Sequence, residues 1–252
     1  METSLGALLA AAIGLANGHI IDLLWGRFYT GEQLRRPITR CNNCRAPSPP
    51  LLMLPLVAGF AWKDRRCPAC GEALSLRSAV LPVAGALLYL LSYAVFDEDL
   101  GAALLGGFWA TTFLTLTLTD LETRLLPNRI VYPGIVVAIP LCWGWPDTSV
   151  VEIMLGGGVA IIIAVLMILL SLPFGSGSFG MGDAKMIVLM GFVLGVPSVL
   201  VGVVLGTFAA GAAAAFLLAT RLRGRRDYIP HGPFLALGAV VAMFWGHGLW
   251  PY

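Results

Sequence analysis

Long apolar segments separated by short polar connections dominate the chain. A helix that crosses about 30 Å of hydrocarbon needs about 20 mostly apolar residues, and on that measure the sequence predicts eight membrane-spanning helices. Their approximate bounds are residues 5–26, 79–96, 101–119, 129–146, 151–173, 184–195, 198–220 and 230–250. The segments show no alternation of polar and apolar residues, which favours helices over the strands of a membrane barrel. The expected fold class is an all-α polytopic membrane protein.

The composition agrees with this pattern. Of the 252 residues, 58% are hydrophobic and only 12% are charged, whereas soluble domains carry about 25% charged residues. The chain therefore lacks the polar residues for a water-facing shell. This excludes a soluble globular protein and a disordered chain.

The sixth span differs from the others. Residues 184–220 form a nearly continuous apolar stretch, too long for one crossing, and the sequence Gly195-Val196-Pro197-Ser198 predicts a turn that divides it. At 1.5 Å per residue, the segment 184–195 reaches only about 18 Å. Either the bilayer thins here, or the residues just before 184, Asp183 among them, lie below the cytoplasmic membrane surface.

Basic residues predict the orientation. All 16 Lys and Arg fall in alternate connections, whereas the opposite connections hold Glu2, Asp97, Glu98, Asp99, Asp147 and Glu152. Because basic residues mark the cytoplasmic side, both termini are expected outside. The first segment has no Lys or Arg ahead of it, so it is interpreted as a retained span rather than a signal peptide. Topology explains the basic residues, so binding of nucleic acid has no support.

Four of the five cysteines form two pairs in the first cytoplasmic loop, residues 27–78. Cys41 and Cys44 make one CxxC pair, and Cys67 and Cys70 the other, with 22 residues between the pairs. Two such pairs predict a closed, tetrahedral, structural zinc site of the zinc-ribbon type. The alternative is two disulfides, which are rare in a reducing cytosol. A loop of this size has little core of its own, so a metal can stabilise it.

Three acidic residues near membrane depth are candidate functional groups: Asp22, Asp120 and Asp183. Two complete spans separate Asp120 from Asp183, so both face the cytoplasmic side. If the two carboxylates meet, they cannot both ionise at low cost, and one can act as a base while the other acts as an acid, as in an aspartic protease. Gly180 and Gly182 would let a backbone approach Asp183 closely and adopt unusual dihedral angles.

Other roles remain open for these residues. Asp183 could cap the sixth helix, and Asn128 could cap the fourth after Pro127. Asp22 is interpreted as an ion-paired residue at the membrane interface. An ion-coupled transporter that uses the three acids as a cation path is the alternative function, and it would be expected to show inverted repeats and charges near the bilayer midplane.

Four motifs together give the chain a family resemblance. They are the paired CxxC loop, the Asp120 segment that ends in Leu125-Leu126-Pro127-Asn128, the sequence Gly180-Met181-Gly182-Asp183-Ala184-Lys185, and the stretch Ile229-Pro230-His231-Gly232-Pro233-Phe234-Leu235-Ala236-Leu237-Gly238. In this order, and over nearly its whole length, the chain resembles the prepilin peptidases, the type IV leader peptidases of bacteria, which are GxGD intramembrane aspartyl proteases.

The resemblance implies a site and a reaction. It implies that Asp120 and Asp183 are the catalytic pair, with Gly180, Gly182, Lys185, Pro127 and Asn128 as supporting residues. The implied substrates are precursors of type IV pilins and type II secretion pseudopilins, cut after a Gly at the cytoplasmic face of the inner membrane.

The resemblance also implies a cofactor and a domain organisation. Many members of the family methylate the new N-terminus with S-adenosylmethionine. The chain departs from the family's pattern at Gly18-His19-Ile20-Ile21-Asp22 and at Ala79-Val80-Leu81-Pro82, which bears on methylation rather than on cleavage. The expected organisation is a first helix (1–26), a zinc-binding loop (27–78) and a seven-helix peptidase domain (79–252).

Overall fold

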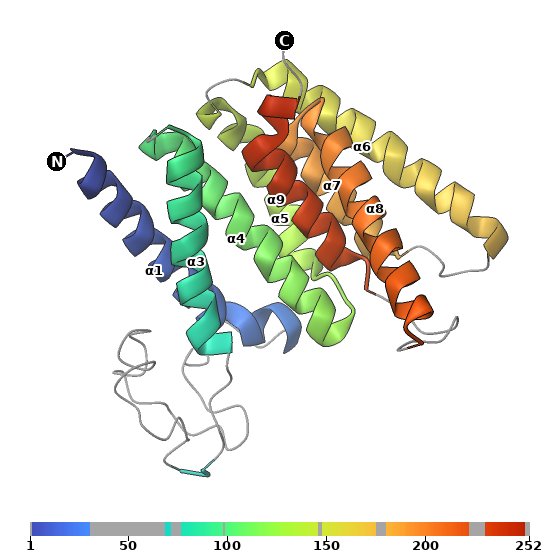
Figure 1. Ribbon diagram of the computed structural model, residues 1–252, viewed down its shortest axis with the longest axis horizontal. Coiled ribbons are helices and arrows are strands. Elements are labelled where there is room, and N and C mark those ends of the chain that lie inside the picture. The colour runs from blue at the N-terminus through green and yellow to red at the C-terminus, as the bar shows by residue number, and fades with distance from the viewer. Residues whose placement is uncertain are drawn as a thin grey trace. The chain divides into compact units, whose positions relative to one another are not determined.

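The regular structure is helical throughout the described part of the chain (Figure 1). The computed structural model describes residues 2–30, 69–71, 77–97, 99–145, 148–174, 180–221 and 230–249. Its α-helices are α1 (Glu2–Thr30), α3 (Arg77–Val95), α4 (Leu100–Thr123), α5 (Asn128–Leu141), α6 (Val150–Ser171), α7 (Met181–Leu194), α8 (Ser198–Ala219) and α9 (Gly232–Leu249). Each matches one of the eight predicted apolar segments, so the all-α prediction is confirmed for these residues.

The chain divides into two compact units, Met1–Thr111 and Thr112–Tyr252. Helix α4 contributes its first half to one unit and its second half to the other. The three-part organisation expected from the sequence stays a prediction.

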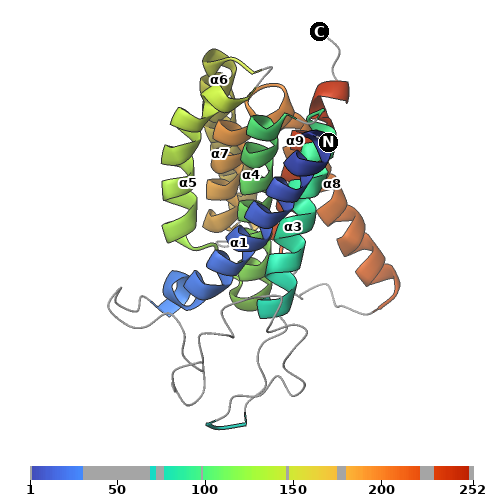
Figure 2. The ribbon, with the colours of Figure 1, turned by 90° about the vertical axis from the view of Figure 1, so that its left-hand side faces the viewer.

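In the first unit, α1 and α3 run side by side and their backbones touch (Figure 2). A Cβ atom added to Gly14 would lie 2.5 Å from the carbonyl oxygen of Gly85, and one added to Gly18 would meet the backbone of Leu81 and Pro82. Small residues allow this approach, which lets membrane helices gain dispersion contacts.

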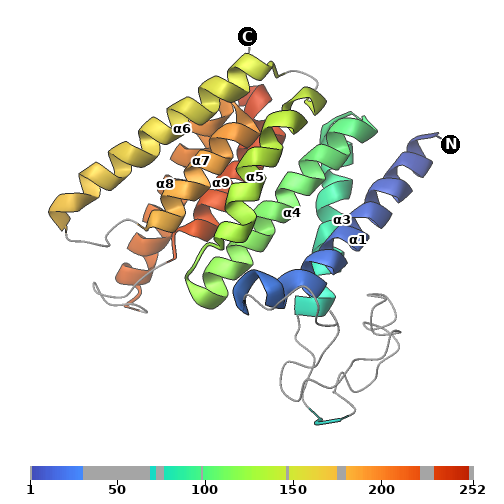
Figure 3. The same cartoon turned by 180° about the vertical axis from the view of Figure 1, so that it is seen from behind.

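In the second unit, two helix pairs pack in the same way (Figure 3). Gly156 of α6 faces Gly191 of α7, and Gly238 of α9 faces Gly202 and Gly206 of α8. Helix α7 also contacts α5 and α9. The result is a set of closely packed helices around α7, the helix that begins two residues before Asp183.

The predicted turn between the sixth and seventh spans is confirmed. Gly195 ends α7 at φ +67°, a conformation that L side chains rarely adopt. The N–H of Val196 then donates to the carbonyl oxygen of Glu152 at 3.2 Å, which ties the turn to the start of α6. Helix α7 has 14 residues and reaches about 21 Å at 1.5 Å per residue, short of a bilayer core of about 30 Å.

Exposed apolar side chains on long helices indicate a membrane environment. Four described helical segments are long and apolar enough to cross a bilayer: Ser4–Asp22, Leu100–Thr123, Val150–Ser171 and Ser198–Ala219. Two shorter apolar segments, Val80–Val95 and Gly232–Gly246, accompany them. On α6, apolar residues such as Ile162 and Leu169 point away from the protein with 68% and 56% of their surface exposed. A helix that is apolar on all sides yet open on one face is suited to lipid rather than to water.

Candidate active site

Asp120 lies in the last turn of α4 and is buried, with 4% of its surface exposed. The backbone of Gly232, the first residue of α9, donates a hydrogen bond to its carboxylate. The Oδ2 atom of this carboxylate is buried and has no hydrogen-bond partner within the described residues. The C-terminal end of a helix disfavours negative charge, so Asp120 does not stabilise α4 as a cap.

Asp183 lies in the first turn of α7 and is 7% exposed. Its carboxylate accepts a hydrogen bond from the backbone of Gly180, the N-cap residue. This is one half of a capping box, in which the third helical residue reaches back to the N-cap amide. The capping role considered from the sequence is thus present, and it does not explain why the carboxylate is buried.

An electrostatic interaction links the two carboxylates: the charge of Asp120 acts on the side chain of Asp183. They come from α4 and α7, which are separated in sequence by two complete helices. Two nearly buried acids that interact in this way disfavour double ionisation, and a pair that shares one proton can serve as base and acid in one reaction.

The two glycines beside Asp183 provide space rather than special backbone angles. Gly180 has φ −74° and ψ 135°, which any residue adopts, and among the described residues the glycines with positive φ are Gly71 and Gly195. The expected unusual dihedral angles are therefore wrong. The expected close approach of a backbone to Asp183 stays a prediction, although both glycines lie in tight places: a Cβ at Gly180 would lie 3.1 Å from Asp183 Oδ2, and one at Gly182 would lie 3.1 Å from Leu126 Cδ1.

Lys185 links α7 to the start of α5. Its Nζ donates to Asn128 Oδ1 at 2.9 Å and lies 5.3 Å from the centre of the Tyr132 ring. Pro127, not Asn128, is the N-cap of α5, and no side chain caps that end. The capping role considered for Asn128 is therefore wrong, because its side-chain oxygen is used by Lys185.

Two residues next to the pair were not among the sequence-predicted site residues. Gly232 contacts Asp120, and His231 directly precedes Gly232 along the chain. The sequence feature that contains both residues is the stretch from Ile229 to Gly238. This stretch contributes to the family resemblance, but the resemblance gave none of its residues a functional role.

The remaining candidates lie in the first unit or outside the described residues. Asp22 is half-buried and interacts electrostatically with His19. The two segments that depart from the family's pattern meet where Gly18 packs on Leu81 and Pro82.

The predicted zinc ligands Cys41, Cys44 and Cys67 lie outside the described residues. Cys70 is exposed in a turn that continues into Gly71 at φ +70°. No cluster of three metal-binding side chains occurs within the described ranges, which contain only this one of the four predicted ligands. Four thiolates with this spacing fit zinc by their chemistry.

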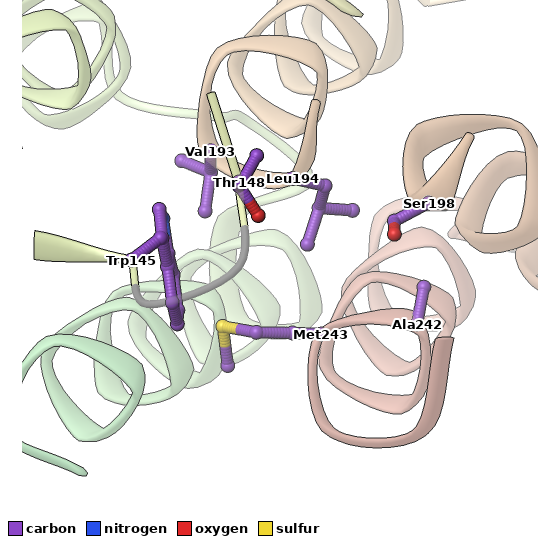
Figure 4. A pocket seen from close by; sticks show the side chains of 7 residues that line it. All are labelled: Trp145, Thr148, Val193, Leu194, Ser198, Ala242 and Met243. Carbon is purple, nitrogen blue, oxygen red and sulfur yellow. The ribbon is translucent and has the colours of Figure 1, made fainter. Parts of the chain in front are cut away.

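Figure 4 shows a small pocket beside Val193 and Leu194, at the C-terminal end of α7. Its lining residues are Trp145, Thr148, Val193, Leu194, Ser198, Ala242 and Met243. Leu194 ends α7, eleven residues after Asp183, so the two ends of the helix are about 16 Å apart. The pocket is therefore separate from the carboxylate pair.

Two family models match the chain. The model described as the type IV leader peptidase family covers residues 107–216, which include Asp120 and Asp183, and the model of the bacterial peptidase A24 N-terminal domain covers residues 12–96. The chain belongs to the type IV leader peptidase family. It is thus a membrane protease of an aspartic peptidase family, which decides against the ion-coupled transporter.

Relatives of the leader peptidase family align over most of the chain. A protein of Bacillus subtilis named prepilin leader peptidase/N-methyltransferase is 26% identical over 250 residues, 91% of this chain and 94% of its own length. Proteins of the same name from Aeromonas hydrophila and Pseudomonas putida are 28% and 26% identical, and each aligns over 73% of its own length. No solved structure gives a significant match.

Proposed function

We propose that this leader peptidase is an intramembrane aspartic endopeptidase whose catalytic groups are Asp120 and Asp183. The observation that carries the proposal is the interaction of two nearly buried carboxylates from α4 and α7, both within the segment that matches the peptidase family. Gly180, Gly182, Lys185, Pro127 and Asn128 support the pair by shaping the ends of α5 and α7 around it.

The chemistry follows from one shared proton. The ionised carboxylate removes a proton from a water molecule, and the oxygen of that water bonds to the carbonyl carbon of the scissile peptide. The protonated carboxylate donates to the carbonyl oxygen, so the tetrahedral intermediate carries no full negative charge. The intermediate then breaks its C–N bond as the amine takes the proton that the first carboxylate removed from water, and the remaining hydroxyl returns a proton to the second carboxylate. No bond forms between the protein and the substrate.

The substrate class follows from position. We place both carboxylates at the cytoplasmic membrane face of the bacterial inner membrane, with both termini outside, because the Lys and Arg residues lie in the connections on that side. A substrate with a short basic leader in the cytosol and an apolar helix in the bilayer presents its scissile bond at this level. Precursors of type IV pilins or type II secretion pseudopilins, cut after Gly, have this form, and the names of the relatives agree with it.

Zinc is proposed as the structural ion of the loop before α3. Cys41, Cys44, Cys67 and Cys70 would hold it, and all four lie within the segment that matches the family's N-terminal domain. An all-thiolate set leaves no open coordination position, so the ion would stabilise the loop without taking part in cleavage.

Methylation of the new N-terminus with S-adenosylmethionine rests on the names of the relatives alone. The described residues give it no separate support, so cleavage is the activity that we propose. A single measurement can report both cleavage and methylation.

The experiment is processing of a prepilin in membranes that contain the full chain. Mass spectrometry of the product should show a new N-terminus directly after the Gly, and a 14 Da increase would reveal methylation in the same spectrum. Asp183→Asn should give no product, whereas Glu122→Gln, which removes an exposed acid on α4, should process normally. Normal processing by inserted Asp183→Asn protein would contradict the proposal.

A further inference from the structure

Gly232 occupies a position where a side chain would displace the carboxylate of Asp120. A Cβ atom built there would lie 2.6 Å from Oδ2 and 3.0 Å from Cγ of Asp120. The first distance is shorter than a carbon–oxygen contact allows, so any other residue would force the carboxylate to move. The helix-packing glycines Gly206 and Gly238 instead face helix backbone. Gly232 is thus in contact with a functional group rather than with a neighbouring helix.

The main chain at Gly232 also faces the carboxylate. Its backbone donates a hydrogen bond to Asp120, and it is the first residue of an 18-residue helix. Helix N-termini favour negative charge because their first N–H groups lack partners within the helix. The buried Oδ2 of Asp120 has no hydrogen-bond partner within the described residues. It lies beside this helix end, 2.6 Å from the position of a Cβ at Gly232.

Hydrogen bonds and helix packing fix the N-terminus of α9. The carbonyl oxygen of His231 accepts the N–H groups of Phe234 and Leu235 at 3.1 and 3.2 Å, which closes the first turn around Gly232. Helix α9 packs on α8 and on α7, the helix that carries Asp183. Gly232 therefore begins a helix that also packs on the helix of the second carboxylate.

We propose that Gly232 is a positioning residue for the peptidase reaction: its backbone amide and its lack of a side chain hold the Asp120 carboxylate in place against the N-terminus of α9 and beside Asp183. The effect on cleavage rests on the proposed function. The contact between residues 120 and 232 does not.

The first test is Gly232→Ala in the full chain. Displacement of a catalytic group by about 1 Å can cost about 100-fold in rate, so kcat for a prepilin should fall by about 100-fold while KM changes little. Adding Asp120→Asn to Gly232→Ala should lower kcat no further than Asp120→Asn alone, because both changes disable the same carboxylate. The matched control is Gly158→Ala in α6, whose added Cβ meets no atom within 4 Å, and it should retain normal kcat.

The second test measures the contact without activity. The position of a Cβ at Gly232 lies 3.3 Å from Asp120 Cβ, close to the separation of about 3.5–4.5 Å in disulfides. The double variant Asp120→Cys with Gly232→Cys should form a disulfide under mild oxidation, detected as linked peptides by mass spectrometry after digestion. The control pair Asp120→Cys with Gly158→Cys should not.

These tests separate the two proposals. Normal kcat for Gly232→Ala, or a cross-link no more abundant than in the control pair, would overturn the role of Gly232. If the cross-link forms while Asp120→Asn still cleaves normally, the contact is supported and the proposed function is refuted. If Gly232→Ala fails to fold, the cysteine pair still decides the contact.

Discussion

The backbone of Gly180 donates a hydrogen bond to the carboxylate of Asp183, three residues later in the first turn of α7. Asp183 therefore serves the helix as well as the proposed reaction. A substitution that removes the side chain would affect both, and a loss of activity alone would not show which role was lost.

Two substitutions separate these roles. Asp183→Asn keeps a side-chain oxygen that can accept the Gly180 N–H, so its thermal stability in detergent should stay close to that of the unchanged protein. Asp183→Ala loses the acceptor and should be less stable by about 1 kcal/mol, as for a lost helix cap. Both should lose cleavage. Equal stability of the two variants would show that the hydrogen bond contributes nothing measurable.

The contact between Lys185 and Asn128 should stabilise the end of the site formed by α5 and α7. Lys185→Met removes the hydrogen bond to Asn128 and the interaction with the Tyr132 ring. Because the pair is exposed, we expect a loss of about 1 kcal/mol in the free energy of unfolding. Asn128→Ala added to Lys185→Met should cost little more, and fully additive losses would argue against a direct interaction.

Glycines at helix contacts should differ sharply from glycines in open positions. Gly238→Leu would drive a side chain into the backbone of α8 at Gly202 and Gly206, so this variant should lose most of its folded protein in detergent. A Cβ atom added to Gly211 on α8 meets no atom within 4 Å, so Gly211→Leu should be tolerated. Fluorescence-detected size-exclusion chromatography of the two variants checks this, and similar profiles would contradict the close packing of α8 and α9.

The cysteine pairs predict about one zinc ion per chain in reductively purified protein. Replacing Cys41 and Cys44 by Ser should abolish the bound metal, whereas Cys142→Ser should not, because Cys142 is buried and donates to the carbonyl oxygen of Ile139. Metal analysis by mass spectrometry gives the ratio of zinc to protein. A value well below one in the unchanged protein would count against the zinc site.

Much of the fold could be predicted from the sequence because the bilayer imposes a simple requirement. Apolar segments of nearly 20 residues must be helical when water cannot satisfy their backbone groups. The Gly195 turn was predictable for a similar reason, since only a glycine readily adopts the angles that end α7.

The details of the site could be predicted only in part. Two complete helices between Asp120 and Asp183 indicated that both lie on one side, but not that they meet, because that depends on how α4 and α7 pack. The role of Gly232 depends on a distance between segments more than 100 residues apart, which spacing along the chain does not contain. A cap was one possible role for Asn128 because capping is local, whereas its hydrogen-bond partner Lys185 comes from another helix.

The most direct test of the account is a double-mutant measurement of kcat/KM for a prepilin with Asp120→Asn, Asp183→Asn and both together, beside Glu122→Gln. If the two carboxylates act as one unit, each single variant should abolish cleavage and the double variant should be no slower than either. Glu122→Gln should cleave normally. Substantial cleavage by either single variant, or independent losses that add in the double variant, would contradict the claim that Asp120 and Asp183 form one catalytic pair.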